Sequence, residues 1–222
     1  MWSTGKMVKR KPQDNLHRFL GITPLLMKFG VTANQVTVGR GILVLPVVIL
    51  ASFGLYLPAF FIHLLSWWGD SIDGSIARER LLRGYKDNKN LGEFLDPMID
   101  KITWISEILL IPWGGNFASV PNKLFFIGIG AMSILVIIET WLGIIRVQDY
   151  MMNRENKKHH IKLAADQSGK IKMVFEVVGL SALILAMRQK EGQYWIYWVW
   201  CLSLIIAIPF AVKSLINKYH RR

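Results

Sequence analysis

Apolar residues fill six long stretches of this chain, and shorter polar stretches separate them. The six apolar stretches cover residues 41–53, 55–68, 91–112, 123–146, 173–187 and 194–216. Apolar runs this long and unbroken favour helices, because a half-buried strand would alternate apolar and polar residues. A bilayer core of about 30 Å needs roughly 20 residues of helix, and each stretch with its flanking residues comes close to that length. The pattern predicts an all-α integral membrane protein with six transmembrane helices.

The start of the first transmembrane helix lies between Thr32 and Thr37, where polar side chains can accept hydrogen bonds from unpaired backbone N–H groups. Arg40 follows near the expected cytoplasmic end of this helix, and Pro46 predicts a kink within it. We therefore expect residues 31–222 to form one six-helix domain.

Residues 1–30 are basic and carry apolar side chains at roughly helical spacing. The apolar positions are Leu16, Phe19, Leu20, Ile22, Leu25, Leu26 and Phe29. This pattern predicts a short amphipathic interfacial helix that lies on the anionic cytoplasmic leaflet before the six-helix domain. The alternative is a solvated basic tail with a helix that packs on the protein core. No apolar stretch here ends in a small-residue cleavage site, so we expect no removable signal peptide.

Composition agrees with a membrane location. Of the 222 residues, 52% are hydrophobic and nine are Trp, and the mean hydropathy is +0.32. A formal charge of +12 would also suit a nucleic-acid partner, but the basic residues cluster in alternate polar segments between apolar stretches. This distribution follows the positive-inside rule. It predicts six spans in the inner (cytoplasmic) membrane with both chain ends in the cytoplasm, and no nucleic-acid partner.

Two pairs of carboxylates lie beside this apolar sequence. Asp70 and Asp73 are three residues apart, and Asp96 and Asp100 are four apart, so each pair shares one helix face. An ionised carboxylate is costly in such surroundings unless it is paired with a cation. Four of them on neighbouring helices indicate a site for a hard divalent metal such as Mg²⁺, Mn²⁺ or Ca²⁺. The alternative is a set of ion pairs with nearby basic side chains.

Small residues and one arginine continue both acidic faces. Gly74, Ala77 and Arg78 extend the face of Asp70 and Asp73, and Gly92 precedes Asp96 by one turn. Small side chains allow a bulky ligand to approach closely. Two facing acidic stripes can hold two divalent ions that bridge phosphate oxygens, and the arginine offers a rigid fork for a phosphate.

These residues at this spacing resemble the signature of the CDP-alcohol phosphotransferase family. Every fixed position of that signature is present: Asp70, Asp73, Gly74, Ala77, Arg78, Gly92, Asp96 and Asp100. The spacer between Arg78 and Gly92, at thirteen residues, is longer than the family usually has. The extra residues fall in a charged loop, so we expect the metal site to be kept.

The resemblance implies a six-helix membrane enzyme, usually a homodimer, that uses two divalent ions, most often Mg²⁺. An alcohol hydroxyl attacks the β-phosphorus of a CDP-linked lipid, and CMP is released. By position, Asp70 and Asp96 bridge both metals and Asp73 binds the first. Asp100 binds the second metal and acts as the general base, which suits a carboxylate beside a metal-held alcohol.

The resemblance also implies donor and acceptor contacts. Residues of both helices would bind the CDP-lipid: Asn34, Gln35, Val36, Thr37, Gly74, Ala77 and Arg78. The segment from Gly169 to Lys172, and the pair Glu139 and Arg146 on one helix face, look like those of phosphatidylglycerophosphate synthases. Three cations there suit a phosphorylated acceptor: Arg146, Lys170 and Lys172. Alternatively, the two lysines anchor a helix at headgroup level.

The sequence thus predicts a phosphatidyltransferase that uses CDP-diacylglycerol in a membrane of lipids, with glycerol 3-phosphate as the favoured acceptor. Inositol phosphate, serine and phosphatidylglycerol are alternative acceptors within the family. A cation transporter is the alternative of another class, although a fixed arginine beside the ions would hinder cation passage.

Overall fold

The computed structural model describes residues 12–85, 89–114, 122–155, 166–188 and 194–220, and over these ranges it is all-helical. Residues 156–165 of the expected basic linker, residues 115–121 of the expected uncharged loop, and residues 1–11 lie outside the described residues. The helices are α1 (Pro12–Phe19), α2 (Ile22–Lys28), α3 (Ala33–Ile42), α4 (Val44–Ser52), α5 (Tyr56–Leu82), α6 (Lys89–Gly114), α7 (Asn122–Glu155), α8 (Gln167–Ala186) and α9 (Trp195–Tyr219).

Helices α3 and α4 together form the first long helical unit. Thr32 caps α3, since its hydroxyl accepts from the N–H of Gln35 while the Gln35 side chain accepts from the N–H of Thr32. This confirms the predicted helix start. The helix breaks at Leu43 because Pro46 has no N–H to donate to the carbonyl one turn earlier, and α4 starts again at Val44.

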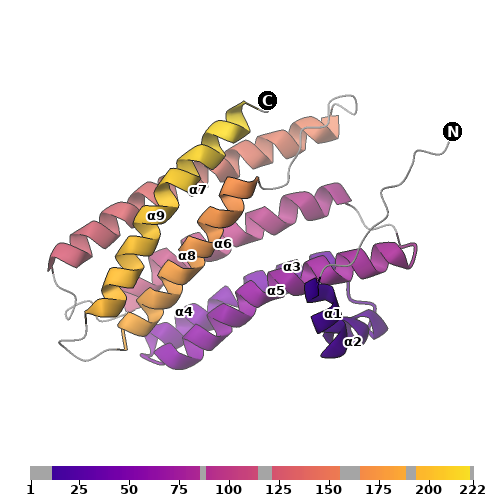
Figure 1. The fold of residues 1–222 in the computed structure, drawn as a ribbon, viewed down its shortest axis with the longest axis horizontal. Coiled ribbons are helices and arrows are strands. Elements are labelled where there is room, and N and C mark those ends of the chain that lie inside the picture. Colours follow the sequence, from indigo (N-terminus) through magenta and orange to yellow (C-terminus); the bar gives the residue numbers. More distant parts are fainter. Residues whose placement is uncertain (1–11, 86–88, 115–121, 156–165, 189–193, 221–222) are drawn as a thin grey trace.

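The N-terminal region contains two short helices rather than one. Gly21, with a φ of 73°, ends α1 and begins α2, and this left-handed conformation strongly favours glycine. Figure 1 shows both helices beside one end of α5, where they pack against it. Several apolar side chains stay exposed on them, with Phe19 the most exposed at 88%.

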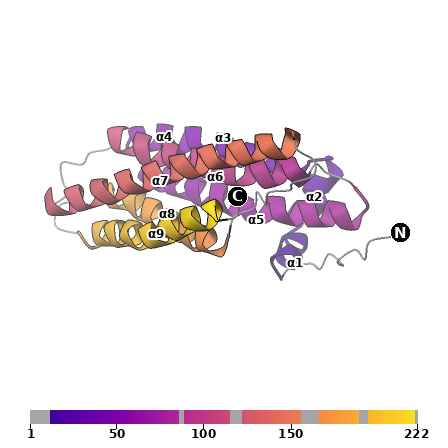
Figure 2. The ribbon, with the colours of Figure 1, turned by 90° about the horizontal axis from the view of Figure 1, so that it is seen from above.

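The long helices form two groups that share α6. Helices α3 and α4 lie along α5 and α6, and α7, α8 and α9 pack together on the other side (Figures 1 and 2). The core between them is apolar and includes large, fully buried rings of Trp104, Trp200 and Tyr197. Cys201 is buried in this core and forms no disulfide in the described part of the chain.

Three described helical stretches are long and apolar enough to cross a membrane: Ala33–Ser52, Asn122–Arg154 and Trp195–Tyr219. Their presence is consistent with a membrane protein. Helices α5, α6 and α8, of 27, 26 and 20 residues, have sufficient length but include more polar residues. The prediction of six transmembrane helices therefore stays a prediction.

Helix α8 begins earlier than its apolar residues suggested. It starts at Gln167, so Lys170 and Lys172 lie on the helix rather than in a linker before it. Asp166 caps it by accepting from the N–H of Gly169, and it also accepts from Ser214 and Asn217 of α9. Partial burial opposes ionisation, but these hydrogen bonds and one from Ser168 hold the pKa of Asp166 well below its usual range.

The contact between α7 and α9 gives a test of the packing. A Cβ added to Gly128 would lie 2.2 Å from the ring of the fully buried Trp200. We expect Gly128→Ala to destabilise the protein by about 1–3 kcal/mol through overpacking, measured as a lower thermal midpoint in detergent. The matched control is Gly130→Ala on the same helix, where an added Cβ meets nothing within 4 Å. Equal midpoints for the two variants would contradict the packing.

Candidate functional site

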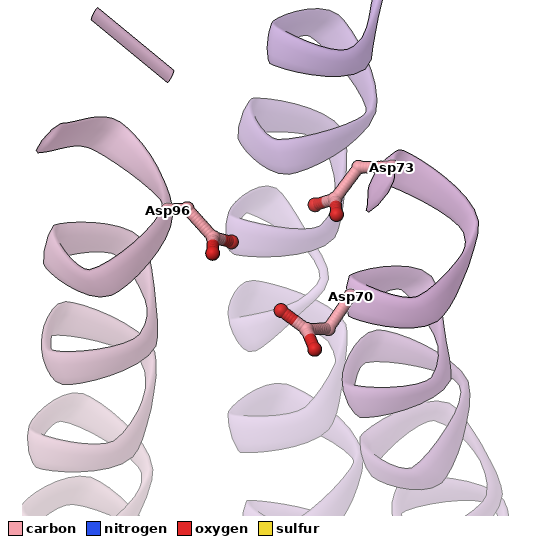
Figure 3. Close-up of side chains that lie close together, drawn as sticks. All are labelled: Asp70, Asp73 and Asp96. Carbon is pink, nitrogen blue, oxygen red and sulfur yellow. The ribbon is translucent and has the colours of Figure 1, made fainter. Parts of the chain in front are cut away.

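Three of the four signature aspartates converge from two helices. Asp70 and Asp73 project from α5 toward Asp96 on α6, as Figure 3 shows, and one carboxylate oxygen of each lies within 4.8 Å of the others. Asp100 lies one turn further along α6. Asp70 and Asp96 keep 39% and 42% of their side chains exposed, whereas Asp73 is 8% exposed. The cluster is therefore buried on one side and open on the other.

Arg40 of α3 places its guanidinium among all four carboxylates. Its Nη2 lies 2.5 Å from Asp96 and 3.4 Å from Asp70. Its Nη1 lies 2.6 Å from Asp100, and its Nε lies 3.3 Å from Asp73. Arg40 is only 4% exposed, and its contacts with Asp73 and Asp100, which are 8% and 14% exposed, are more shielded from water than surface ion pairs.

The backbone around Arg40 explains how its side chain reaches the cluster. Its carbonyl accepts a hydrogen bond from Ser66 of α5 at 2.9 Å. A Cβ on Gly69 would lie 3.2 Å from the Arg40 Cβ, so the glycine lets α3 lie close to α5. One turn before Arg40, Thr37 donates to Asp73 at 2.8 Å. The structure thus brings Thr37 to the acidic cluster.

The other predicted donor residues lie on α3 and α5. The amide oxygen of Asn34 would lie 3.2 Å from a Cβ on Gly92, so this signature glycine leaves room for α3. Gln35 serves the helix cap, Val36 is half-buried, and Ala77 is exposed on α5.

Arg78 lies flat against Gly74. Its Nη1 is 3.2 Å from the position that a Cβ on Gly74 would take. The other edge of its guanidinium pairs with Asp14 of α1, at 2.7 Å from Nε and 2.5 Å from Nη2. This partner lies outside the signature, and the sequence alone did not indicate it.

A cavity lined by charged and apolar side chains adjoins Asp100. Its lining includes Asp100 of α6, Glu139 and Arg146 of α7, and Lys172 of α8. Glu139 and Arg146, predicted to share one helix face, do line the same cavity. Arg146, the predicted acceptor-binding arginine, and Asp100, the predicted base, therefore line the same cavity.

The charged groups of this cavity are unequally paired. Glu139 accepts from both Lys101 and Lys172, and Lys172 also lies 3.6 Å from Glu176. By contrast, Arg146 is buried, and its Nε and Nη1 have no hydrogen-bond partner in the described part of the chain. A buried guanidinium with unused N–H groups favours an anionic ligand.

The two acceptor lysines differ in their surroundings. Lys172 is buried between two carboxylates, which balance its positive charge. It therefore supports the cavity wall and is poorly suited to bind a ligand. Lys170 is exposed and close enough to Asp70 to interact with it electrostatically. Of the two, Lys170 is therefore better placed to meet a ligand at the opening.

A second buried pair lies deeper in the bundle. His63 Nδ1 is 2.8 Å from a carboxylate oxygen of Glu107, and both side chains are fully buried. Glu107 is thus the hydrogen-bond partner of His63 within the bundle.

A family model for CDP-alcohol phosphatidyltransferases matches residues 30–210, which is most of the chain. The chain belongs to this family. No curated protein and no solved structure matches it. The predicted family is thus confirmed, and the chain is a transferase of substituted phosphate groups by family. Its family reaction takes a CDP-alcohol donor and an alcohol acceptor.

The family uses divalent metals, and the aspartates fit them. Carboxylate oxygens are the ligands that hard divalent cations prefer, and three of them already lie within reach of one ion. In the structure Arg40 forms ion pairs with all four carboxylates. The predicted alternative of ion pairs with a basic side chain is therefore observed, and a bound metal ion would compete with this guanidinium.

Arg40, Lys101 and Asp14 were not identified as site residues from the sequence. A signal for Arg40 was present, since it follows Asn34 and Thr37 at helical spacing and four carboxylates need a cation. The partners of Lys101 and Asp14 are far along the chain, so no local pattern marks them.

Arg40 stabilises the four carboxylates and also competes with a metal ion for them. Replacing it should separate these two effects. We expect Arg40→Ala to lower the thermal midpoint by several degrees in EDTA, because the buried carboxylates then repel one another unpaired. Mn²⁺ should bind Arg40→Ala more tightly than it binds the wild type, since the ion no longer competes with the guanidinium. Added Mn²⁺ should therefore raise the thermal midpoint of Arg40→Ala more than that of the wild type. Arg40→Lys, which keeps the charge, is the control. An unchanged midpoint for Arg40→Ala in EDTA would contradict this role.

Proposed function

We propose that this protein transfers the phosphatidyl group of CDP-diacylglycerol to an alcohol, most favourably glycerol 3-phosphate, to give phosphatidylglycerophosphate and CMP. The observation that carries the acceptor class is the buried, unpaired edge of Arg146 in a cavity that also contains Asp100. A dianionic phosphate would satisfy those N–H groups and bring its hydroxyl end toward the carboxylate.

The residues of this chain have the following roles in the proposed reaction. Two divalent ions, preferably Mg²⁺, would be held by Asp70, Asp73, Asp96 and Asp100. When bound, these ions would neutralise the charge of the diphosphate. Arg78 binds the diphosphate, Gly74 and Ala77 leave it room, and the segment from Asn34 to Thr37 borders the nucleotide.

Asp100 is the general base. As the acceptor oxygen bonds to the β-phosphorus, the hydroxyl proton passes to the Asp100 carboxylate, and the bond from phosphorus to the CMP oxygen breaks. Arg146 orients the acceptor phosphate, Lys170 supplies positive charge at the opening, and Lys172 holds Glu139 in place. The paired state of Lys172 supports a positioning role for it.

The membrane arrangement belongs to the same proposal. Residues 31–222 form one domain whose six helical units span the inner membrane, with α3 and α4 as one unit. Residues 1–30 lie on its cytoplasmic surface. The active site opens to the cytoplasm, where the lipid donor and a water-soluble acceptor meet, and the enzyme works as a homodimer. Basic residues in the alternate connecting segments support this topology.

The first test follows CMP release from purified protein in detergent with CDP-diacylglycerol, Mg²⁺ and one alcohol at a time. We expect glycerol 3-phosphate to support release well above inositol phosphate, serine and phosphatidylglycerol, and we expect EDTA to abolish it. If serine alone supported CMP release, the family reaction would stand, but glycerol 3-phosphate would be wrong as the acceptor.

A transporter would behave differently in the same preparation. If no alcohol released CMP while reconstituted vesicles took up Mg²⁺, the proposed enzyme function would be wrong.

The second test concerns the base. We expect Asp100→Asn to lower kcat by about 10²–10⁴, which is the usual contribution of a general base, while CDP-diacylglycerol binding is largely kept. Turnover is measured as CMP release at saturating substrates, and donor binding by titration in Mn²⁺. Complete loss of donor binding would argue against the base role and for a purely metal-binding one.

A further inference from the structure

Helix α1 lies outside the matched family domain of residues 30–210, yet it contributes a buried acid to the site. Asp14 is 3% exposed and its partner Arg78 belongs to the signature. Carboxylates are rarely buried to this extent unless they are paired. Helix α1, which lies outside the matched residues, is therefore joined to Arg78, a proposed donor-binding residue.

The two hydrogen bonds fix the arginine in one orientation. Asp14 takes the edge formed by Nε and Nη2 in a bidentate pair, at 2.7 and 2.5 Å. Neither bond uses Nη1, which lies against Gly74 on the signature face of α5. The side chain of Arg78 is 21% exposed. One edge of the guanidinium is thus held while the other remains for a ligand.

Helix α1 is held on α5 at more than this one point. His17 is 1% exposed, and its Nε2 lies 3.3 Å from the hydroxyl of Ser71. Its ring meets that of Trp68 edge to face, with centroids 5.7 Å apart. The opposite side of α1 exposes Leu16 and Phe19. Asp14 therefore sits on an anchored helix and can orient a neighbouring side chain.

We infer that Asp14 is a positioning residue for donor binding, which holds Arg78 with Nη1 directed toward the diphosphate of the CDP-lipid. This inference rests on the proposed function. Without Asp14, the arginine has to be ordered by the donor itself, and the lost side-chain entropy weakens binding. Asp14 acts through Arg78 rather than on the reacting atoms, so chemistry at saturation depends little on it.

The experiment compares steady-state kinetics of Asp14→Ala with wild type in detergent. We expect KM for CDP-diacylglycerol to rise about tenfold, a loss of about 1.4 kcal/mol of donor binding, while kcat and KM for the acceptor change less than about twofold. Mn²⁺ affinity, measured by titration, should also stay unchanged. Asp14→Glu should recover part of the donor affinity. The matched control is Asn15→Ala, an exposed neighbour on the same helix, which should behave as wild type.

A double-mutant cycle separates positioning from simple stabilisation of the fold. If Asp14 acts through Arg78, then Asp14→Ala should add almost nothing to the KM defect of Arg78→Ala. Additive defects, or a kcat loss with unchanged donor KM, would overturn the inference. A lower donor KM in Asp14→Ala would also overturn it, because α1 would then compete with the donor.

Failure of this inference is distinct from failure of the proposed function. Wild-type CMP release decides whether the proposed function holds. If the wild type is active and the donor KM of Asp14→Ala equals that of Asn15→Ala, only the role of Asp14 is wrong.

Discussion

Four carboxylates from two helices converge on a single guanidinium, and the arrangement of the first three long helical units depends on that contact. Asp70 and Asp73 of α5 and Asp96 and Asp100 of α6 would repel one another without a cation between them. Arg40 brings α3 into the same cluster, and the small Gly69 lets the helix lie close enough. The requirement for positive charge at this point suits the cluster to divalent ions.

Other charges inside the bundle are arranged so that most of them are paired. Glu139 lies between two lysines, Lys218 of α9 lies 2.9 Å from Asp149 of α7, and Glu107 is bound to a histidine. Buried charges are tolerated when their partners satisfy them. Arg146 differs from them, because its Nε and Nη1 have no hydrogen-bond partner among the described residues, which supports its proposed role in acceptor binding.

The N-terminal region lies before the matched residues 30–210 and contacts a residue of the signature. Two short helices separated at Gly21 replace the single expected one, and α1 reaches the signature through Asp14. Its exposed apolar side chains still suit a membrane surface, so the predicted interfacial position stays a prediction. The contact between Asp14 and Arg78 links this region to α5 within the signature.

The sequence by itself determined the features that follow from spacing along one helix. The signature aspartates, the start of α3 at Thr32 and the break near Pro46 are of this kind, because residues three or four apart share a helix face and caps and prolines act locally. Only the tertiary structure decided which distant charges meet. Arg40 lies 56 residues from Asp96, and Asp14 lies 64 from Arg78. The early start of α8 depended likewise on Asp166, whose cap is reinforced by α9. Pairing over such separations depends on how whole helices pack, and no local pattern of residues specifies it.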